Sequence, residues 1–350
     1  MFSNHLRHAF IALAALFAFT AGAAHAEKRN FELTIDTVNI TVNPALKFTV
    51  FAFDGQVPGP LLHVKEGDEV TLKVTNRTGL PHSIHWHGIF NTWQNDGVPL
   101  VTQEDIKPGE SFTYNFIANP TGSLWYHCHV NVHEHVAYRG MWAPLIVDPK
   151  DPTDLEKKVT KDFIMMLSAY DSEWKDKPGF GGHPKDVANY FAINARTFPY
   201  TQPLRVKKGD FVRIRFYGAG GETHNIHTHG HSFLVTHKDG NPLPMPYTAD
   251  TISISPGERY DIMFEANNPG RWAIHDHVDH HVTDDGKYPG GVITVMEYDE
   301  VQKSDAWYAW KDLAYDGNFF YQDSLTKGYG KWSHQPFKGE YPQRRRGAQQ

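Results

Sequence analysis

The stretch Trp-Tyr-His-Cys-His at residues 125–129 contains Cys128, the only cysteine of the 350-residue chain, between two histidines. Side chains i and i+2 of a β-strand point to the same side, so a His-x-His pair can direct two imidazoles at one place. A thiolate combined with imidazoles is a soft, nitrogen-rich ligand set that suits copper better than calcium or magnesium. The stretch therefore predicts copper redox chemistry on a framework of strands.

Three further His-x-His pairs belong with the first to an internal repeat. The motif His-x-x-His-x-His-Gly at residues 82–88 recurs at 224–230, and Lys-x-Gly-Asp at 65–68 recurs at 207–210. The segment 127–129 has its counterpart at 275–277, where aspartate replaces the cysteine. Alternating apolar and polar residues at 69–74 and 211–216 are typical of short strands. The sequence thus predicts an all-β chain with two copies of one β-sandwich or barrel domain.

Composition sets the expected boundaries of these domains. Residues 1–26 combine a positive charge, a short apolar run and a small-residue cleavage site, which predicts a signal peptide and a periplasmic or secreted protein. Domain 1 is expected at 27–149, domain 2 at 150–300, and a C-terminal extension at 301–350. The aromatic residues of this extension favour packing on another surface over a disordered tail. They are Trp307, Trp310, Phe319, Phe320, Tyr321, Tyr329 and Trp332.

Charge and cysteine usage narrow the function classes further. The net charge of −6 gives no reason to expect nucleic-acid binding, and nothing after the leader resembles a membrane span. An exported chain with one cysteine forms no internal disulfide, so Cys128 is free, intermolecular or a metal ligand. Its histidine neighbours favour the metal.

Five segments, in their order and spacing, resemble the multicopper oxidases. They are Asp54–Pro60, His85–Gly88, Trp125–His129, Gly140–Val147 and the histidine motif at 224–231. The resemblance covers roughly residues 50–296 and implies two tandem cupredoxin-like Greek-key β-sandwich domains. It is greatest to two-domain, laccase-like members with the blue type 1 copper in domain 1, because Asp276 holds the cysteine's place in the second repeat.

This resemblance implies four coppers per subunit. The type 1 copper would be bound by His82, Cys128, a second histidine and the axial Met141. His133 and His135 are both candidates for the second histidine, and His135 is favoured because it lies closer to Met141. By the same resemblance, His85 and His227 bind the type 2 copper. The type 3 pair would be bound by His87, His127, His129, His229, His275 and His277.

Such a ligand set implies an enzyme that oxidises a donor at the type 1 copper and reduces dioxygen to water at the trinuclear cluster. The donor would be a phenol, an aromatic amine or a small redox protein. Cys128 would carry electrons between the centres, and Asp96 would help to protonate bound oxygen, with Asp279 a weaker candidate. His224 and His281 resemble the remains of a second blue site that lacks a thiolate.

Two other functions compete with the oxidase, and a separate alternative concerns the assembly of the subunits. Copper nitrite reductases have aspartate where this chain has His85 and lack a histidine at position 129, and a non-enzymatic copper or electron-transfer protein needs only one site. The resemblance further implies a homotrimer, in which domain 1 of one subunit faces domain 2 of the next and each interface holds one cluster. A monomer with the cluster between its own domains is the alternative.

Overall fold

The computed structural model describes residues 26–176, 187–301 and 328–333, which form four β-sheets. Among these residues, helix is confined to the four-residue α1 (Val132–His135) and short 3-10 turns. The prediction of an all-β chain is confirmed. Apart from its last position, the leader expected at residues 1–26 lies outside the described residues.

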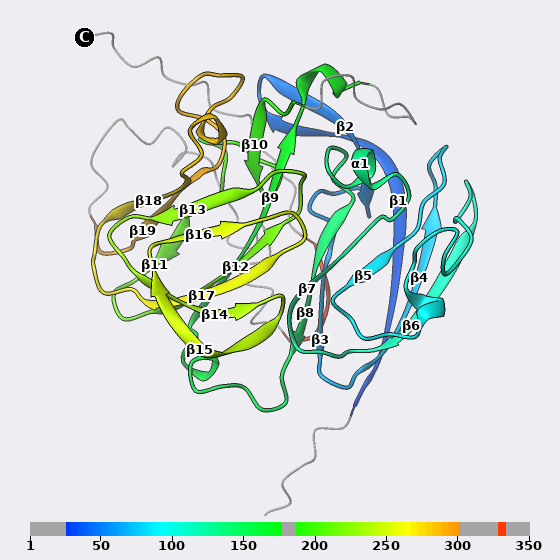
Figure 1. Cartoon of the computed structure of the whole chain (residues 1–350), viewed down its shortest axis with the longest axis horizontal. Helices are drawn as coiled ribbons and strands as arrows, with labels where there is room; N and C mark the ends of the chain where they lie inside the picture. Colours follow the sequence, from blue (N-terminus) through cyan, green and yellow to red (C-terminus); the bar gives the residue numbers. More distant parts are fainter. Residues whose placement is uncertain (1–25, 177–186, 302–327, 334–350) are drawn as a thin grey trace, which may run out of the picture.

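The first half of the chain builds two sheets, and strand β20 of the C-terminal extension joins one of them (Figure 1). One has the strand order β2-β1-β4-β6, and the other has the order β20-β3-β8-β7-β5. Their strands are β1 (Lys28–Asn43), β2 (Leu46–Phe53), β3 (Leu61–Lys65), β4 (Glu69–Asn76), β5 (His85–His87), β6 (Ser111–Ile117), β7 (Gly122–His127), β8 (Trp142–Asp148) and β20 (Gly330–Trp332).

The second half builds a similar pair of sheets. Their orders are β10-β9-β12-β17-β14-β15 and β11-β19-β18-β13-β16. The strands are β9 (Lys161–Tyr170), β10 (Tyr190–Ile193), β11 (Leu204–Val206), β12 (Phe211–Gly218), β13 (His224–Thr228), β14 (Phe233–Lys238), β15 (Asn241–Ala249), β16 (Thr251–Ile254), β17 (Arg259–Glu265), β18 (Arg271–Asp276) and β19 (Ile293–Tyr298).

The repeat seen in the sequence returns in the strand pairing. Strand β4 pairs parallel with β1 and antiparallel with β6, and β12 pairs in the same way with β9 and β17. Strands β7 and β8 form an antiparallel pair that corresponds to β18 and β19. Both alternating segments of the sequence, 69–74 and 211–216, lie in these strands, β4 and β12.

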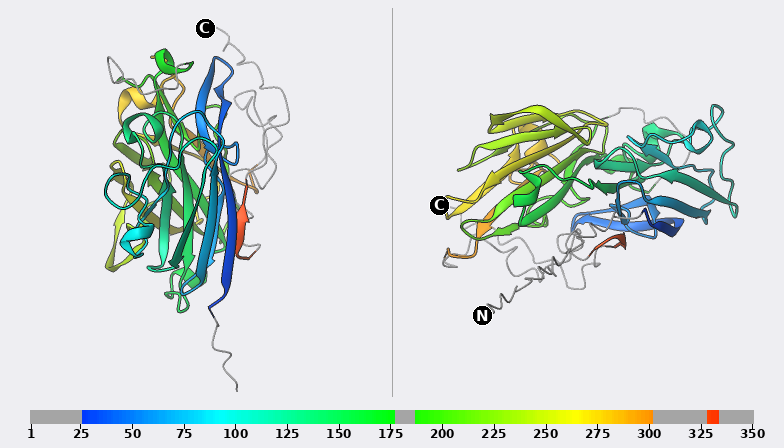
Figure 2. Two further views of the ribbon diagram at one scale, coloured as in Figure 1. Left: turned by 90° about the vertical axis from the view of Figure 1, so that its right-hand side faces the viewer. Right: turned by 90° about the horizontal axis from the view of Figure 1, so that it is seen from below.

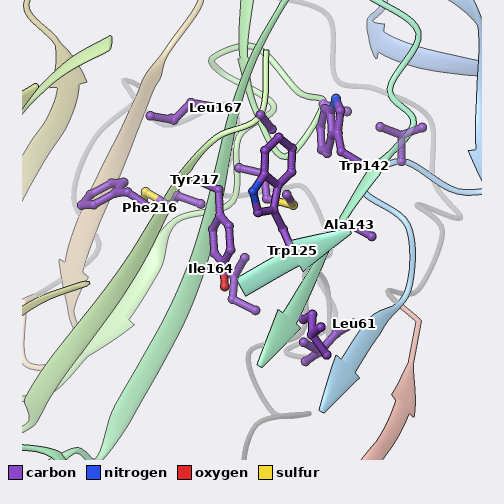
Figure 3. Close-up of a cluster of buried hydrophobic side chains, with 14 of the residues drawn as sticks. Leu61, Trp125, Trp142, Ala143, Ile164, Leu167, Phe216 and Tyr217 are labelled. Atoms are coloured by element: carbon purple, nitrogen blue, oxygen red, sulfur yellow. The ribbon is translucent and has the colours of Figure 1, made fainter. Parts of the chain in front are cut away.

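The buried apolar side chains of the two halves form one cluster (Figure 3). Trp125 of the first half lies close to Ile164 and Tyr217 of the second, and all three are buried. Burial of aromatic side chains contributes strongly to stability, because each removes a large area from water. The two halves are therefore packed against each other through a shared apolar core.

A buried polar contact also joins the halves at β7. Ser123 donates a hydrogen bond of 2.6 Å from Oγ to Asp261 Oδ1 and accepts one of 2.8 Å from Arg215 Nη1. Arg259 donates from Nε to the backbone carbonyl of Ser123 at 3.2 Å. These bonds fix β7, the strand that leads into Cys128, against β12 and β17.

The described part of the C-terminal extension, residues 328–333, packs on the first half. Strand β20 extends the sheet at β3 (Figure 2). Lys331 Nζ donates to the backbone carbonyl of Glu32 in β1. Tyr329 packs edge-on against His63, with ring centroids 5.0 Å apart, and Trp332 packs against the core. The other aromatic residues named for the extension lie outside the described residues. They are Trp307, Trp310, Phe319, Phe320 and Tyr321.

Across residues 26–176, 187–301 and 328–333, the structure contains no helix with the length and apolarity needed to cross a membrane.

Candidate metal centres

The first centre surrounds Cys128, which follows directly on β7. Its Sγ lies 3.6 Å from His82 Nδ1 and 3.4 Å from His135 Nδ1, and all three side chains are completely buried. Bonds of about 2.0–2.3 Å from a metal to nitrogen and sulfur would place trigonal ligand atoms about 3.7 Å apart. The spacing therefore fits one small ion held by a thiolate and two imidazoles.

Met141 is placed beside this centre by two backbone hydrogen bonds. Its carbonyl accepts from the Cys128 N–H at 3.1 Å, and its own N–H donates to the His135 carbonyl at 3.0 Å. The side chain of Met141 is completely buried. A buried thioether at this position suits the weak axial ligand of a blue copper site.

Of the two candidate histidines, the structure brings His135 to the cysteine. His133 is exposed and packs edge-on against Tyr138 and Trp174, with ring centroids 5.9 and 6.0 Å apart. Both histidines lie in α1, where residues two positions apart are rotated by about 200° around the helix axis. They therefore face opposite sides, and only one of them can reach Cys128.

Burial prepares the imidazoles of this centre for metal binding. It lowers the pKa of His82 to about 2, with a smaller effect of His135, and the pKa of His135 to about 4, with a smaller effect of Arg139. Burial also raises the pKa of the Cys128 thiol to about 12. Both imidazoles are thus neutral at physiological pH and offer lone pairs, whereas a metal must displace the thiol proton.

Thr78 orients His82, which the sequence did not reveal. Thr78 Oγ1 lies 2.8 Å from His82 Nε2, a contact that fits a protonated Nε2 and leaves the Nδ1 lone pair facing Cys128. An outer hydrogen bond of this kind fixes the tautomer of a metal-binding histidine. No motif marks Thr78, because the bond depends on the path of the loop between β4 and His82.

The second centre is a quartet of histidines in the first half, which we call the domain 1 quartet. Its members are His85, His87, His127 and His129. The ring of His85 lies 5.2–5.6 Å from the other three. His87 Nδ1 approaches His127 Nε2 to 3.3 Å, and the ligand atoms of these two and of His85 lie within 4.8 Å of one another.

Backbone carbonyls orient two members of this quartet. His85 Nδ1 lies 2.8 Å from the Asp96 carbonyl, and His127 Nδ1 lies 2.8 Å from the Cys128 carbonyl. Each Nδ1 therefore carries a proton, and each Nε2 is free to bind a metal. Burial, with a smaller effect of the nearby charge of Arg259, lowers the pKa of His87 to about 3. Arg259 is a second residue that sequence reasoning missed.

The equivalent quartet of the second half, the domain 2 quartet, lies at the surface. Its members are His227, His229, His275 and His277. His229 Nε2 approaches His275 Nε2 to 3.0 Å, and the ring of His227 lies 5.9 Å from that of His277. His227 Nδ1 and His275 Nδ1 contact the carbonyls of Asp250 and Asp276 at 2.9 and 2.8 Å. His229 and His277 are exposed.

Strand ends carry the histidine pairs. The pair 85–87 forms β5 completely, whereas the other three pairs begin on a strand and end one or two residues beyond it, after β7, β13 and β18. In Figure 1, β5 and β7 lie on the right and β13 and β18 on the left. Among the described residues, no ring contact joins one quartet to the other.

Asp96 follows the 3-10 turn η1 (Trp93–Asn95) beside the domain 1 quartet. Its carboxylate Oδ1 lies 3.4 Å from His85 Nδ1, and its side chain is partly exposed. Asp279, in η4 (Asp279–Val282), borders a surface pocket shared with His275 and His277. Both carboxylates thus lie near a quartet, and Asp96 makes the direct contact.

The third cluster consists of His224, Asp276 and His281. All three side chains are buried, and both imidazoles contact the carboxylate through Nδ1. The structure therefore brings together the two histidines that the sequence suggested as remains of a blue site, with Asp276 between them.

Comparisons with known proteins agree with this geometry. Two family models described as multicopper oxidase match residues 34–152 and 173–286. The chain is 32% identical over 251 residues to the multicopper oxidase MmcO of Mycobacterium tuberculosis, which covers 62% of this chain and 48% of that protein. It spans about half the length of the curated relatives that it matches.

Solved structures of similar size give closer matches. The multicopper oxidase mgLAC is 62% identical with a TM-score of 0.86, and the blue copper oxidase from Nitrosomonas europaea is 55% identical with a TM-score of 0.87. Each match covers 90% of this chain and 99% of the other. A copper nitrite reductase from Nitrosomonas europaea is 26% identical with a TM-score of 0.67, covering 78% of this chain and 95% of the other.

The chain therefore belongs to the multicopper oxidases. Its two β-sandwich halves are cupredoxin-like, and copper is the metal of its centres.

Proposed function

We propose that this chain is an oxidase that takes single electrons from a reducing substrate and reduces dioxygen to water. When bound, copper supplies the one-electron redox chemistry by which four electrons, collected singly, reach one oxygen molecule. One observation carries the proposal. The segment 127–129 takes part in two centres, because Cys128 contacts His82 and His135 while the histidines on both sides of it lie against His85.

The resemblance to the multicopper oxidases assigns the proposed ligands, and the clusters support the assignment. His82, Cys128, His135 and the axial Met141 would hold the type 1 copper, and His85 and His227 the type 2 copper. The type 3 pair would be held by His87, His127, His129, His229, His275 and His277.

The shared segment gives electrons a path between the centres. Cys128 is bonded through the backbone to His127 on one side and His129 on the other, so an electron crosses only covalent bonds. His82 and His135 are completely buried, so the donor acts across intervening protein and does not touch either imidazole. The proposed donors are phenols, aromatic amines or a similar reductant, including a small redox protein.

Asp96 has two proposed roles beside the type 2 site. Its carbonyl holds the proton on His85 Nδ1, and this directs Nε2 toward the metal. Its partly exposed carboxylate can take a proton from water and pass it toward the cluster. Proton supply is needed because each oxygen molecule takes up four protons on its way to water.

The cluster requires both quartets, and we propose that a homotrimer unites them. The domain 2 quartet is surface-exposed, and it makes no ring contact with the domain 1 quartet of its own chain among the described residues. A contact between domain 1 of one subunit and domain 2 of the next is heterologous, and such contacts close into a ring. Three subunits would then form three clusters.

We propose that the protein works in the periplasm or outside the cell.

A copper nitrite reductase is the second candidate, since that class shares the fold. It would leave most of the domain 2 quartet without a role. A mononuclear copper carrier would leave both quartets without one.

Oxygen and nitrite turnover distinguish the first two candidates. With a phenol as donor, we expect the copper-loaded protein to consume oxygen without accumulating peroxide. We expect its rate of nitrite reduction to be far below its rate of oxygen reduction. An oxygen electrode, a peroxide assay and a nitrite assay measure these three quantities. A protein that reduces nitrite and ignores oxygen would reverse the assignment.

His85→Ala is expected to remove the type 2 copper and most of the oxygen reduction while sparing the blue absorption. Loss of one imidazole weakens that copper site, but His82, Cys128 and His135 do not depend on it. Electron paramagnetic resonance reports the type 2 copper, and visible absorption reports the blue site. His133→Ala, which lies outside both centres, is the control and should keep the copper content of the native protein. Equal losses in both variants would contradict the ligand assignment.

A further inference from the structure

The buried cluster of His224, Asp276 and His281 occupies the position that the blue site has in the first half. By the internal repeat, His224 and Asp276 correspond to His82 and Cys128. His281 contacts Asp276 as His135 contacts Cys128, although its spacing from Asp276 in the sequence is that of His133 from Cys128. The backbone hydrogen bonds correspond as well. Asp276 N–H donates to the Val292 carbonyl at 3.0 Å, and Val292 N–H donates to the His281 carbonyl at 2.8 Å. The same two bonds link Cys128, Met141 and His135, so Val292 takes the place of the axial methionine.

The distances within the cluster are those of hydrogen bonds. Asp276 Oδ2 lies 2.7 Å from His224 Nδ1 and 2.8 Å from His281 Nδ1, whereas the corresponding sulfur-to-nitrogen distances in the first half are 3.6 and 3.4 Å. Two ligands bound at about 2.0–2.2 Å to one metal would be about 3.5–3.8 Å apart in a trigonal arrangement. The oxygen-to-nitrogen distances of the second cluster are thus shorter than those expected between two ligands of one metal.

The carboxylate of Asp276 is fully engaged without a metal. Its Oδ1 accepts from the backbone N–H groups of Asn225 and Val278 at 2.9 and 3.0 Å, in addition to the two imidazole contacts of Oδ2. A buried carboxylate is stabilised when several donors satisfy its oxygens. These four contacts tie Asp276 to β13 and to the turn that follows β18.

His224 carries its proton on Nδ1, where it contacts Asp276, whereas His82 carries its proton on Nε2, where it contacts Thr78. Thr78 Oγ1 lies 2.8 Å from His82 Nε2, but Gly220 stands at the equivalent position, and His224 Nε2 has no hydrogen-bond partner among the described residues. A metal on Nδ1 of His224 would move its proton to Nε2, leaving a buried N–H with no acceptor, which is costly.

A side chain at position 220 could not restore that acceptor. A Cβ there would lie 2.9 Å from the Cα of Ser168 in β9, closer than real contacts allow. The second half therefore combines three changes with one effect: aspartate for cysteine, valine for methionine and glycine for threonine. Each favours a hydrogen-bonded cluster over a metal site.

We propose that His224, Asp276 and His281 form a metal-free clamp. Its carboxylate holds together the segments whose counterparts in the first half copper would hold together. The clamp thereby positions His275 and His277 for the trinuclear cluster. Asp276 lies between these two histidines in sequence, so fixing its side chain fixes the backbone from which both project. Asp276 is thus a positioning residue and not a ligand. The positioning role rests on the proposed function, whereas the metal-free state of the clamp does not.

Neutron diffraction on the copper-loaded protein tests the clamp itself. We expect exchangeable hydrogens on Nδ1 of both His224 and His281, and no metal between the three side chains. A metal ion in the cluster, or a hydrogen on Nε2 of His224 with Nδ1 bare, would overturn the proposal. This result is independent of whether the protein reduces oxygen.

Substitution of Asp276 tests the positioning role. Asp276→Asn should weaken copper binding at the trinuclear cluster roughly 10–100-fold, the range typical of outer-shell partners of metal ligands. It should also diminish the near-ultraviolet band of the coupled copper pair, while the blue absorption stays native because Cys128 is untouched. Asp299→Asn, an exposed carboxylate of the same half, is the matched control. Native copper content and cluster spectrum in Asp276→Asn would contradict the role.

Two variants of His224 separate positioning from general loss of folding. His224→Asn keeps an N–H near the position of Nδ1 and should retain the cluster spectrum, whereas His224→Leu should lose it with the blue absorption intact. Equal spectra for the two variants would overturn the clamp. If the native protein itself fails to bind four coppers, the proposed function fails, and the neutron result still decides the clamp.

Discussion

Cys128→Ser is expected to abolish the blue absorption and to reduce steady-state oxygen consumption to background, while the coppers of the trinuclear cluster stay bound. The thiolate is the ligand that gives a blue site its intense colour, and in our proposal it also carries the electrons toward the histidines on both sides of it. Serine is close in size but offers a harder, far more basic oxygen. Visible absorption, copper analysis and an oxygen electrode measure the three effects.

Met141→Leu is the matched control for this variant. It removes the proposed axial ligand but keeps the thiolate and both imidazoles, so the blue colour should persist with an altered reduction potential. Blue absorption that survives in Cys128→Ser would refute the type 1 assignment.

Mixing two inactive variants should restore oxygen consumption. His87→Ala disables the domain 1 quartet and His229→Ala the domain 2 quartet, so neither variant alone forms an intact cluster. In a ring where each interface joins domain 1 of one subunit to domain 2 of the next, every mixed trimer has one interface without either substitution. Random reassembly of equal amounts should therefore recover about one quarter of native activity.

A second mixture provides the control for subunit exchange. His85→Ala and His87→Ala both alter the domain 1 quartet, so all their mixed interfaces carry a substitution and no activity should return. Recovery in both mixtures, or in neither after proven exchange, contradicts a cluster shared between subunits.

The strands and the repeat were predictable because their signals are local. Alternation of apolar and polar residues at 69–74 and 211–216 reflects the two faces of β4 and β12, although Arg215 of β12 is buried in the contact between the halves. The pairing of β20 with β3 was not predictable, because it joins residues far apart in the sequence and has no periodic signal.

The candidate site was predictable in composition but not in detail. Sequence spacing left His133 and His135 both open, and the short helix α1 separates them by turning them to opposite sides. The sequence marked His224 and His281 as remains of a site. It could not show that Asp276 contacts both, because a hydrogen bond depends on the position of each side chain to within a few tenths of an ångström.

Copper analysis and light scattering on one chromatographic peak test whether the trinuclear cluster is built between subunits. We expect a trimer that contains four coppers per chain and consumes oxygen. Two coppers per chain would point to a nitrite reductase and one to a carrier, while a fully loaded, active monomer would contradict a cluster built between subunits.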